Sequence, residues 1–291
     1  MKTPISYYGG KQRIASQIVP YIWGIPHTVY AEPFFGGGSI LYAKGKRYTE
    51  NSHHYREAIN DKNQTLITFW KVAREQPEEL DRYLQLTPYS QAEHKRAKTI
   101  YETPLDFSEL EIAWAVYIRC NMSFANQIGS GWQTATSGCN HTHKWKAKKD
   151  RLPECFKRLD EVYIGCEDAI AFIKRWDSPQ TIFYCDPPYP GADQGHYSGY
   201  SLEDYQSLCN SLDNCQGSYI LSNYAQAIVP DSVQKVIEIQ AVMTAASKDK
   251  TGEKERIEIL YICDRSSGMR GDIAKIAKTP NRIQQMSLLD L

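Results

Sequence analysis

The sequence Thr181-Ile182-Phe183-Tyr184-Cys185-Asp186-Pro187-Pro188-Tyr189 joins an apolar run to a turn that cannot continue it. The apolar and β-prone residues of its first half predict a buried strand. The two prolines that follow each remove a backbone donor and fix φ. We therefore expect Asp186 at the carboxyl end of a strand, with Tyr189 exposed just beyond it. In open α/β sheets, ligands bind at this edge.

The chemistry of this turn suits a flat heterocycle that carries an exocyclic amine. The Asp186 carboxylate can accept one N–H of the amine, and the carbonyl of Pro187 can accept the other. The Tyr189 ring can cover the face of the heterocycle, while Pro188 stiffens the turn. Acceptors placed in this way draw the nitrogen lone pair out of conjugation and leave it able to attack a methyl group.

A second stretch, residues 28–40, predicts a strand, a glycine loop and a helix in that order. This is the order in which a Rossmann-like fold binds a cofactor that contains adenosine. Because the glycine spacing is not G-x-G-x-x-G, a cofactor without phosphates is favoured over a dinucleotide. Glu32, at the end of the predicted strand, can meet a cationic amino group. Asp61 follows Gly38 by 23 positions, which suits either ribose hydroxyls or a helix cap.

In identity and order, the motifs Tyr7–Lys11, Glu32–Ser39, Asp61 and Asp186–Tyr189 resemble those of the Dam-type (alpha group) DNA adenine-N6 methyltransferases. The resemblance covers roughly residues 4–265. It implies an α/β fold, with a Rossmann-like class I methyltransferase sheet and an inserted, mostly helical target-recognition domain. It also implies site-specific transfer of a methyl group from S-adenosylmethionine to the N6 amine of a flipped adenine in double-stranded DNA. No metal is expected.

The same resemblance implies which residues bind the cofactor. Asp168 matches the acidic position that meets the adenine amino group of the cofactor, although the neighbouring Glu167 is an alternative. Tyr7 stands where relatives often carry tryptophan, and we expect it to stack on the cofactor. The full implied set is Tyr7, Lys11, Glu32, Phe34, Gly36, Gly38, Asp61, Asp168 and Asp186.

The recognition domain is predicted at residues 63–159, between catalytic segments 1–62 and 160–265. Residues 119–132 mix amides, an arginine, aromatics and glycines, which can read base edges, stack on bases or wedge between them. Lysines at 144–149 suit phosphate contacts. The candidate DNA-binding residues are Arg119, Asn121, Asn126, Lys144, Lys146 and Lys148.

Several local patterns predict the remaining secondary structure. A short helix after Lys11 is expected to end near Pro20. Ser201 and Asp204 have the spacing of a helix-capping box. A strand is predicted at 219–224, and a closing hairpin is predicted from 236–239 and 257–262.

Bulk composition limits the function classes. Lys+Arg and Asp+Glu are balanced at 34 each, so nucleic-acid binding requires a local patch rather than an overall positive charge. Neither a signal peptide nor a membrane span is visible. The eight cysteines contain no CxxC pair and predict reduced thiols in a cytoplasmic protein. Residues 266–291 resemble a flexible tail, in which Gln285–Leu289 resembles peptides that dock on bacterial sliding clamps.

Four other functions remain open from the sequence, and one of them is adenine methylation of RNA. N4-cytosine methylation needs the same acceptors, and Asp186 at the first motif position favours adenine only by family likeness. A catalytically idle DNA-binding module would bind DNA without methyl transfer. A nucleotide-dependent oxidoreductase would bind a dinucleotide, which the glycine spacing disfavours.

Overall fold

The computed structural model describes residues 1–7, 9–46, 54–189, 200–224, 228–242 and 255–268. The chain forms two compact units. The helical unit comprises Met1–Gln12, Gly36–Ala43 and Asp61–Cys166, and the sheet unit comprises Arg13–Phe35, Lys44–Asn60 and Glu167–Leu291. Within the described ranges, no helix combines the length and the apolar character needed to cross a membrane.

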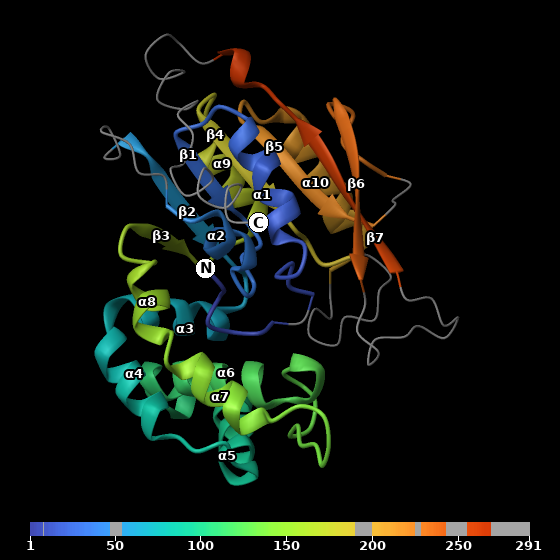
Figure 1. Ribbon diagram of the computed structural model, residues 1–291. Helices are drawn as coiled ribbons and strands as arrows, with labels where there is room; N and C mark the ends of the chain where they lie inside the picture. The colour runs from blue at the N-terminus through green and yellow to red at the C-terminus, as the bar shows by residue number, and fades with distance from the viewer. Residues whose placement is uncertain (8, 47–53, 190–199, 225–227, 243–254, 269–291) are drawn as a thin grey trace, which may run out of the picture. The chain divides into compact units, whose positions relative to one another are not determined.

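The sheet has seven strands in the order β3-β2-β1-β4-β5-β7-β6 (Figure 1). Strands β2, β1, β4 and β5 pair in parallel, whereas β7 is antiparallel to both β5 and β6. The order reverses between β1 and β4, and ligands of such sheets bind at this switch point. The predicted Rossmann-like class is therefore confirmed. The strands are β1 (Val29–Glu32), β2 (Arg56–Asn60), β3 (Val162–Gly165), β4 (Thr181–Cys185), β5 (Ser218–Asn223), β6 (Lys235–Val242) and β7 (Glu255–Cys263).

Helices α9 (Ala169–Trp176) and α10 (Leu202–Asn214) cover one face of the sheet (Figure 1). Their apolar side chains, among them Phe172 and Leu208, join one buried cluster with Phe183 of β4 and Leu221 of β5. Burial of this cluster stabilises the sheet unit, at about 25 cal/mol per Å² of apolar surface removed from water. Strand β4 lies between β1 and β5 and all five of its residues are buried, as its continuous apolar run predicts.

Most local predictions in the sheet unit are confirmed. The Ser201 hydroxyl and the Asp204 side chain form the expected capping box at the start of α10. The closing hairpin is the β6–β7 pair. The prediction that the first helix ends at Pro20 is wrong, because α1 (Ala15–Gly24) continues through it. A proline removes only one hydrogen bond from the helix, and the buried apolar face of α1 outweighs that loss.

The helical unit contains α3 (Gln64–Glu75) and α6 (Glu109–Met122), as the helical periodicity of residues 66–74 and 108–117 predicts. The polar stretch between them holds two further helices that the periodicity did not reveal, α4 (Pro77–Leu86) and α5 (Gln91–Glu102). Each buries only two or three side chains, so its sequence is mostly polar. Besides strand β3, this unit also contains α2 (Ser39–Lys44, its last residue in the sheet unit), η2 (Pro104–Asp106), η3 (Phe124–Asn126), α7 (His141–Lys149) and α8 (Leu152–Lys157).

The predicted recognition segment, residues 63–159, falls within the longest segment of the helical unit, Asp61–Cys166. That unit also contains two N-terminal segments that the sequence assigned to the catalytic part, Met1–Gln12 and Gly36–Ala43. Beyond η5 (Ser266–Gly268), the C-terminal tail lies outside the described residues. The predicted clamp-docking peptide Gln285–Leu289 is part of that tail and stays a prediction.

Candidate active site

The tip of β4 carries the predicted catalytic turn. Asp186 is half-buried and follows Cys185, the last residue of the strand, as the sequence predicts. Pro187 is buried and Pro188 is half-buried. The turn is thus held against the protein, and the carboxylate sits at the edge where the order of parallel strands reverses.

Tyr189 is not exposed, which corrects the expectation from the sequence. Its ring is half-buried and meets Tyr224 edge to face, with the ring centroids 4.5 Å apart. Its hydroxyl donates to Glu258 Oε1 at 2.7 Å and lies 3.1 Å from Asp186 Oδ1. Burial, together with the carboxylates of Asp186 and Glu258, raises the pKa of Tyr189 well above 10. The Tyr189 side chain is therefore held both by its hydroxyl and by the edge-to-face contact of its ring with Tyr224.

Glu32, at the end of β1, is a buried acid on the other side of the switch point. It accepts a hydrogen bond from the Tyr30 hydroxyl at 2.7 Å and is only 2% exposed. Burial raises the pKa of Glu32 from 4.5 to about 8, against the hydrogen bond from Tyr30 and the charge of Lys44. The carboxylates of Glu57 and Asp186 add to the increase. A cationic ligand would relieve this crowding of acids.

Lys44 supplies a buried positive charge in this region that the sequence did not single out. It forms an ion pair with Glu57 of β2, and its side chain is fully buried. Its ammonium group also lies over the rings of Tyr30, Trp23 and Tyr55, at 4.4, 4.9 and 5.2 Å from their centroids. These cation–π contacts and the ion pair offset the cost of burying the lysine.

Asn60, the last residue of β2, is another residue that the sequence analysis missed. Its side-chain amide donates to the carbonyls of Pro33 and Glu167, at 3.1 and 3.0 Å, and accepts from the Glu167 backbone N–H at 3.0 Å. Its own carbonyl accepts from the Phe35 N–H at 2.8 Å. One buried side chain thus ties the loop after β1, with Phe34 in its middle, to the segment before α9.

Asp168 caps helix α9, because Oδ1 accepts from the N–H groups of Ile170 and Ala171 at 2.9 and 3.3 Å. The side chain is otherwise exposed. Its rival Glu167 forms a two-point contact with Arg175, at 2.9 and 3.1 Å. Since Glu167 is already paired with a cation, Asp168 is the more accessible acid of the two.

In the helical unit, Asp61 braces the glycine loop. Its Oδ2 accepts from the Gly36 N–H and its Oδ1 accepts from the Asn63 N–H, each at 2.9 Å. Burial raises the pKa of Asp61, while these two hydrogen bonds oppose the increase. Asn63, and not Asp61, is the N-cap of α3. Asp61 therefore does not form the helix cap that the sequence left open, and it supports the glycine loop instead.

The glycines of this loop are required by the backbone and by close packing. Gly36 and Gly38 have φ values of +49° and +70°, which other residues rarely adopt. A Cβ on Gly37 would lie 2.6 Å from the Cβ of Tyr7, so Tyr7 packs directly on the loop. Lys11 is 7% exposed, and its Nζ donates to the Gly9 carbonyl at 3.4 Å. Tyr7, Lys11 and the glycine loop are thus ordered parts of one unit.

Comparison with known proteins now gives the family. Residues 7–245 match the model of the D12 class N6 adenine-specific DNA methyltransferases. The chain belongs to this family. It is an enzyme that methylates adenine in DNA, and DNA is its partner.

Solved structures resemble this methyltransferase only distantly. The rRNA methyltransferase aviRa from Streptomyces viridochromogenes is 12% identical, with a TM-score of 0.37 and 90% of each chain covered. The putative methyltransferase yhhF from Escherichia coli is 8% identical, with a TM-score of 0.37 and 90% and 91% of the two chains covered. Because both TM-scores are below 0.5, these structures give no independent support for the fold. The fold assignment rests on the strand order of the sheet. A comparison with curated proteins found no match.

Two predicted base-reading residues of the methyltransferase are buried. Arg119 is 2% exposed and donates to the carbonyls of Ile128 and Ser130. It also contacts His94, and burial together with the Arg119 charge lowers the pKa of that histidine to about 4. Arg119 therefore stabilises the loop through internal hydrogen bonds, and its buried side chain is not accessible to DNA.

Asn121 and Lys148 form a second internal cluster. Asn121 is 7% exposed, donates to the Pro4 carbonyl at 3.3 Å and accepts from the Ser6 N–H at 3.2 Å. Lys148 Nζ donates to Asn121 Oδ1 at 2.6 Å and to Ser6 Oγ at 2.8 Å. Burial lowers the pKa of Lys148 to about 8. Asn121 was expected to contact a base and Lys148 a phosphate, but in the structure both side chains form internal hydrogen bonds, as Arg119 does.

The exposed part of the recognition segment is smaller than predicted. Lys144 and Lys146 of α7 are exposed, whereas Trp145 between them is buried and donates to the Thr87 carbonyl at 3.1 Å. On η3, Phe124 is 55% exposed and Asn126 is half-buried with φ of +58°. Its neighbour Ala125 also has a positive φ, +53°. Two successive left-handed residues other than glycine are strained, which is typical of functional loops.

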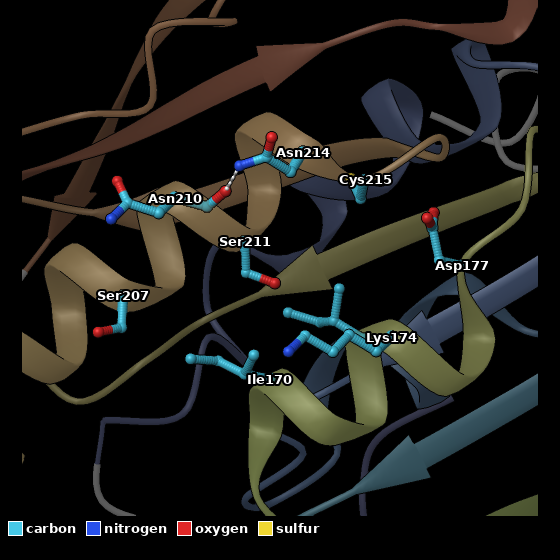
Figure 2. A pocket seen from close by; sticks show the side chains of 9 residues that line it. Ile170, Lys174, Asp177, Ser207, Asn210, Ser211, Asn214 and Cys215 are labelled. Atoms are coloured by element: carbon cyan, nitrogen blue, oxygen red, sulfur yellow. Dashed lines mark hydrogen bonds between the residues drawn. The ribbon is translucent and has the colours of Figure 1, made fainter.

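A surface groove on the sheet unit lies between α9 and α10 (Figure 2). Figure 2 shows Ile170 and Lys174 on one side and Ser207, Asn210 and Ser211 on the other. None of the predicted catalytic or cofactor residues lines this groove.

Proposed function

We propose that Asp186 and the carbonyl of Pro187 accept the two N–H bonds of the adenine N6 amine during methyl transfer. The observation that carries this proposal is the place of Asp186, directly after buried β4 and beside Glu32 at the switch point of the sheet. Acceptors aimed at the reacting nitrogen and the orientation of two bound reactants supply the main catalytic effect. Pro188 keeps the turn rigid.

Adenine must leave the duplex for this chemistry, because its amine is paired there. Flipping costs a few kcal/mol, and stacking on an aromatic ring returns about 1–3 kcal/mol per base. Tyr189 is the ring proposed for this stacking. Its fixed orientation supports the role, since less side-chain entropy is lost when the base arrives.

The proposed cofactor is S-adenosylmethionine, which supplies an electrophilic methyl group when bound. Its ammonium group fits Glu32, a buried acid whose pKa is raised by burial and by other acids around it. In the helical unit, Asp61 and the glycine loop are proposed to receive the ribose, and Tyr7 to stack on the cofactor. The full set proposed to hold it remains Tyr7, Lys11, Glu32, Phe34, Gly36, Gly38, Asp61, Asp168 and Asp186.

For the DNA contacts we propose a reduced set of side chains. Lys144 and Lys146 are exposed on α7 and suit phosphates. Asn126 is proposed to contact a base edge, and Phe124 is proposed to wedge between bases, as apolar side chains on DNA-binding loops do. All eight cysteines are free thiols, which supports a reducing, cytoplasmic location.

The test uses purified protein, duplex DNA and S-adenosylmethionine with a labelled methyl group, followed by nucleoside analysis. The wild type is expected to yield N6-methyladenine. Asp186→Ala is expected to lower kcat by about 10²-fold or more, the usual cost of losing one group aimed at the reacting centre. Binding of S-adenosylmethionine should largely survive. Asp160→Ala is the matched control, because that aspartate is exposed in the turn before β3. Retained turnover by Asp186→Ala would defeat the assignment.

A further inference from the structure

Glu258 is a buried acid outside every motif that the sequence singled out. It lies on β7 and is only 4% exposed. The β5–β7 register pairs Asn223 with Ile259, so Glu258 lies one residue past the end of β5. Since Cys185 of β4 pairs with Leu221 of β5, this register brings Glu258 to the same edge of the sheet as Asp186.

Two hydroxyl groups converge on one oxygen of this carboxylate. Ser222 Oγ donates to Glu258 Oε1 at 2.6 Å, and the Tyr189 hydroxyl donates to the same atom at 2.7 Å. The Tyr189 hydroxyl also lies 3.1 Å from Asp186 Oδ1. Glu258 and Asp186 therefore compete for the same donor.

A phenol has a single proton to donate. The contact with Glu258 is 0.4 Å shorter than the contact with Asp186, so the proton is directed mainly at Glu258. If Glu258 were absent, the hydroxyl would turn to Asp186 and occupy an acceptor that the adenine amine needs. The Tyr189 ring would also lose the anchor that Glu258 provides, while its edge-to-face contact with Tyr224 would remain.

We propose that Glu258 is a positioning residue for methyl transfer, which fixes the Tyr189 ring and directs the Tyr189 proton away from Asp186. This inference rests on the proposed role of Asp186 as the acceptor of the adenine amine. Glu258 acts through Tyr189 and does not itself touch the substrate. Ser222 completes the arrangement by holding the acceptor oxygen in place.

A double-mutant cycle between Glu258→Ala and Tyr189→Phe tests the proposal, because phenylalanine keeps a ring but carries no competing proton. We expect Glu258→Ala to lower kcat about 10-fold in the wild-type background, the order of effect of losing one hydrogen bond, with KM for S-adenosylmethionine unchanged. In the Tyr189→Phe background, the same substitution should change kcat less than about twofold. Glu258→Gln keeps an acceptor oxygen and should retain most of the activity.

The cycle separates positioning from a merely structural role. If Glu258 only stabilises the fold, Glu258→Ala would lower the melting temperature in both backgrounds and would lower kcat by the same factor in each. That result would overturn the proposal. An unchanged kcat in Glu258→Ala would overturn it as well. Glu258→Leu fills a similar volume without an acceptor and replaces the alanine variant if that variant does not fold. Glu238→Ala is the control, since Glu238 is exposed on neighbouring β6.

The same assay includes Asp186→Ala, so that the two proposals can fail separately. If Asp186→Ala stays active, the proposed function is wrong and Glu258 loses its role with it. If Asp186→Ala is inactive but the Glu258 and Tyr189 substitutions are additive, only the role of Glu258 is wrong.

Discussion

The buried acid Glu32 predicts a specific pH dependence of stability. Its pKa is raised from 4.5 to about 8, first by burial. Between these two values the folded protein keeps a proton that the unfolded chain releases, so stability falls as pH rises. The stability that neutral Glu32 contributes is thus fully present below pH 4.5 and is lost as pH rises through about 8. Between these two pKa values, the free energy of unfolding falls by about 1.4 kcal/mol for each pH unit. The total loss is roughly 5 kcal/mol.

Glu32→Gln removes this titration while keeping an oxygen that accepts from the Tyr30 hydroxyl. We expect the stability of the variant relative to the wild type to increase by about 1.4 kcal/mol per pH unit between pH 5 and 8. Urea titrations of both proteins at several pH values in this window measure the difference. Titrating groups that do not interact with Glu32 are common to the two proteins and cancel in the comparison.

A constant difference in stability between the two proteins from pH 5 to 8 would refute the reasoning, because Glu32 would then titrate alike in the folded and unfolded states. Glu238→Gln provides the matched control, since that glutamate is exposed. This control measures how the loss of one exposed carboxylate affects stability across the same window.

Three further predictions concern the recognition segment. Arg119→Lys removes the planar fork by which Nη2 donates to the carbonyls of Ile128 and Ser130 while Nη1 contacts His94, so it should lower the free energy of unfolding by about 2 kcal/mol without DNA present; an unchanged melting curve would contradict this. Lys144→Gln and Lys146→Gln should each weaken DNA binding at all sequences and reduce the slope of log K against log[salt] by about 1, whereas Lys98→Gln, exposed on α5, should change neither. Phe124→Ala should reduce base flipping, read from the fluorescence of 2-aminopurine at the target position, and Leu105→Ala, 99% exposed elsewhere on the helical unit, should not.

The sequence by itself determined the elements whose causes are local. The apolar run of 181–185 specified a buried strand, and the prolines after it ended that strand at Asp186. The positive φ values of Gly36 and Gly38 explain why glycine is needed there. The capping boxes at Ser108 and Ser201 likewise depend on residues three positions apart.

Only the tertiary structure decided what the polar side chains do, because their partners lie far along the chain. Tyr189 was expected to be exposed, yet its hydroxyl bonds to Glu258, 69 positions away. Asp61 braces Gly36 from 25 positions away, and Asn121 bonds to Pro4 across 117 positions. A sequence shows that such a residue can donate or accept a hydrogen bond. Burial and strand register, which follow from packing of the whole unit, decide whether that capacity serves the fold or a ligand.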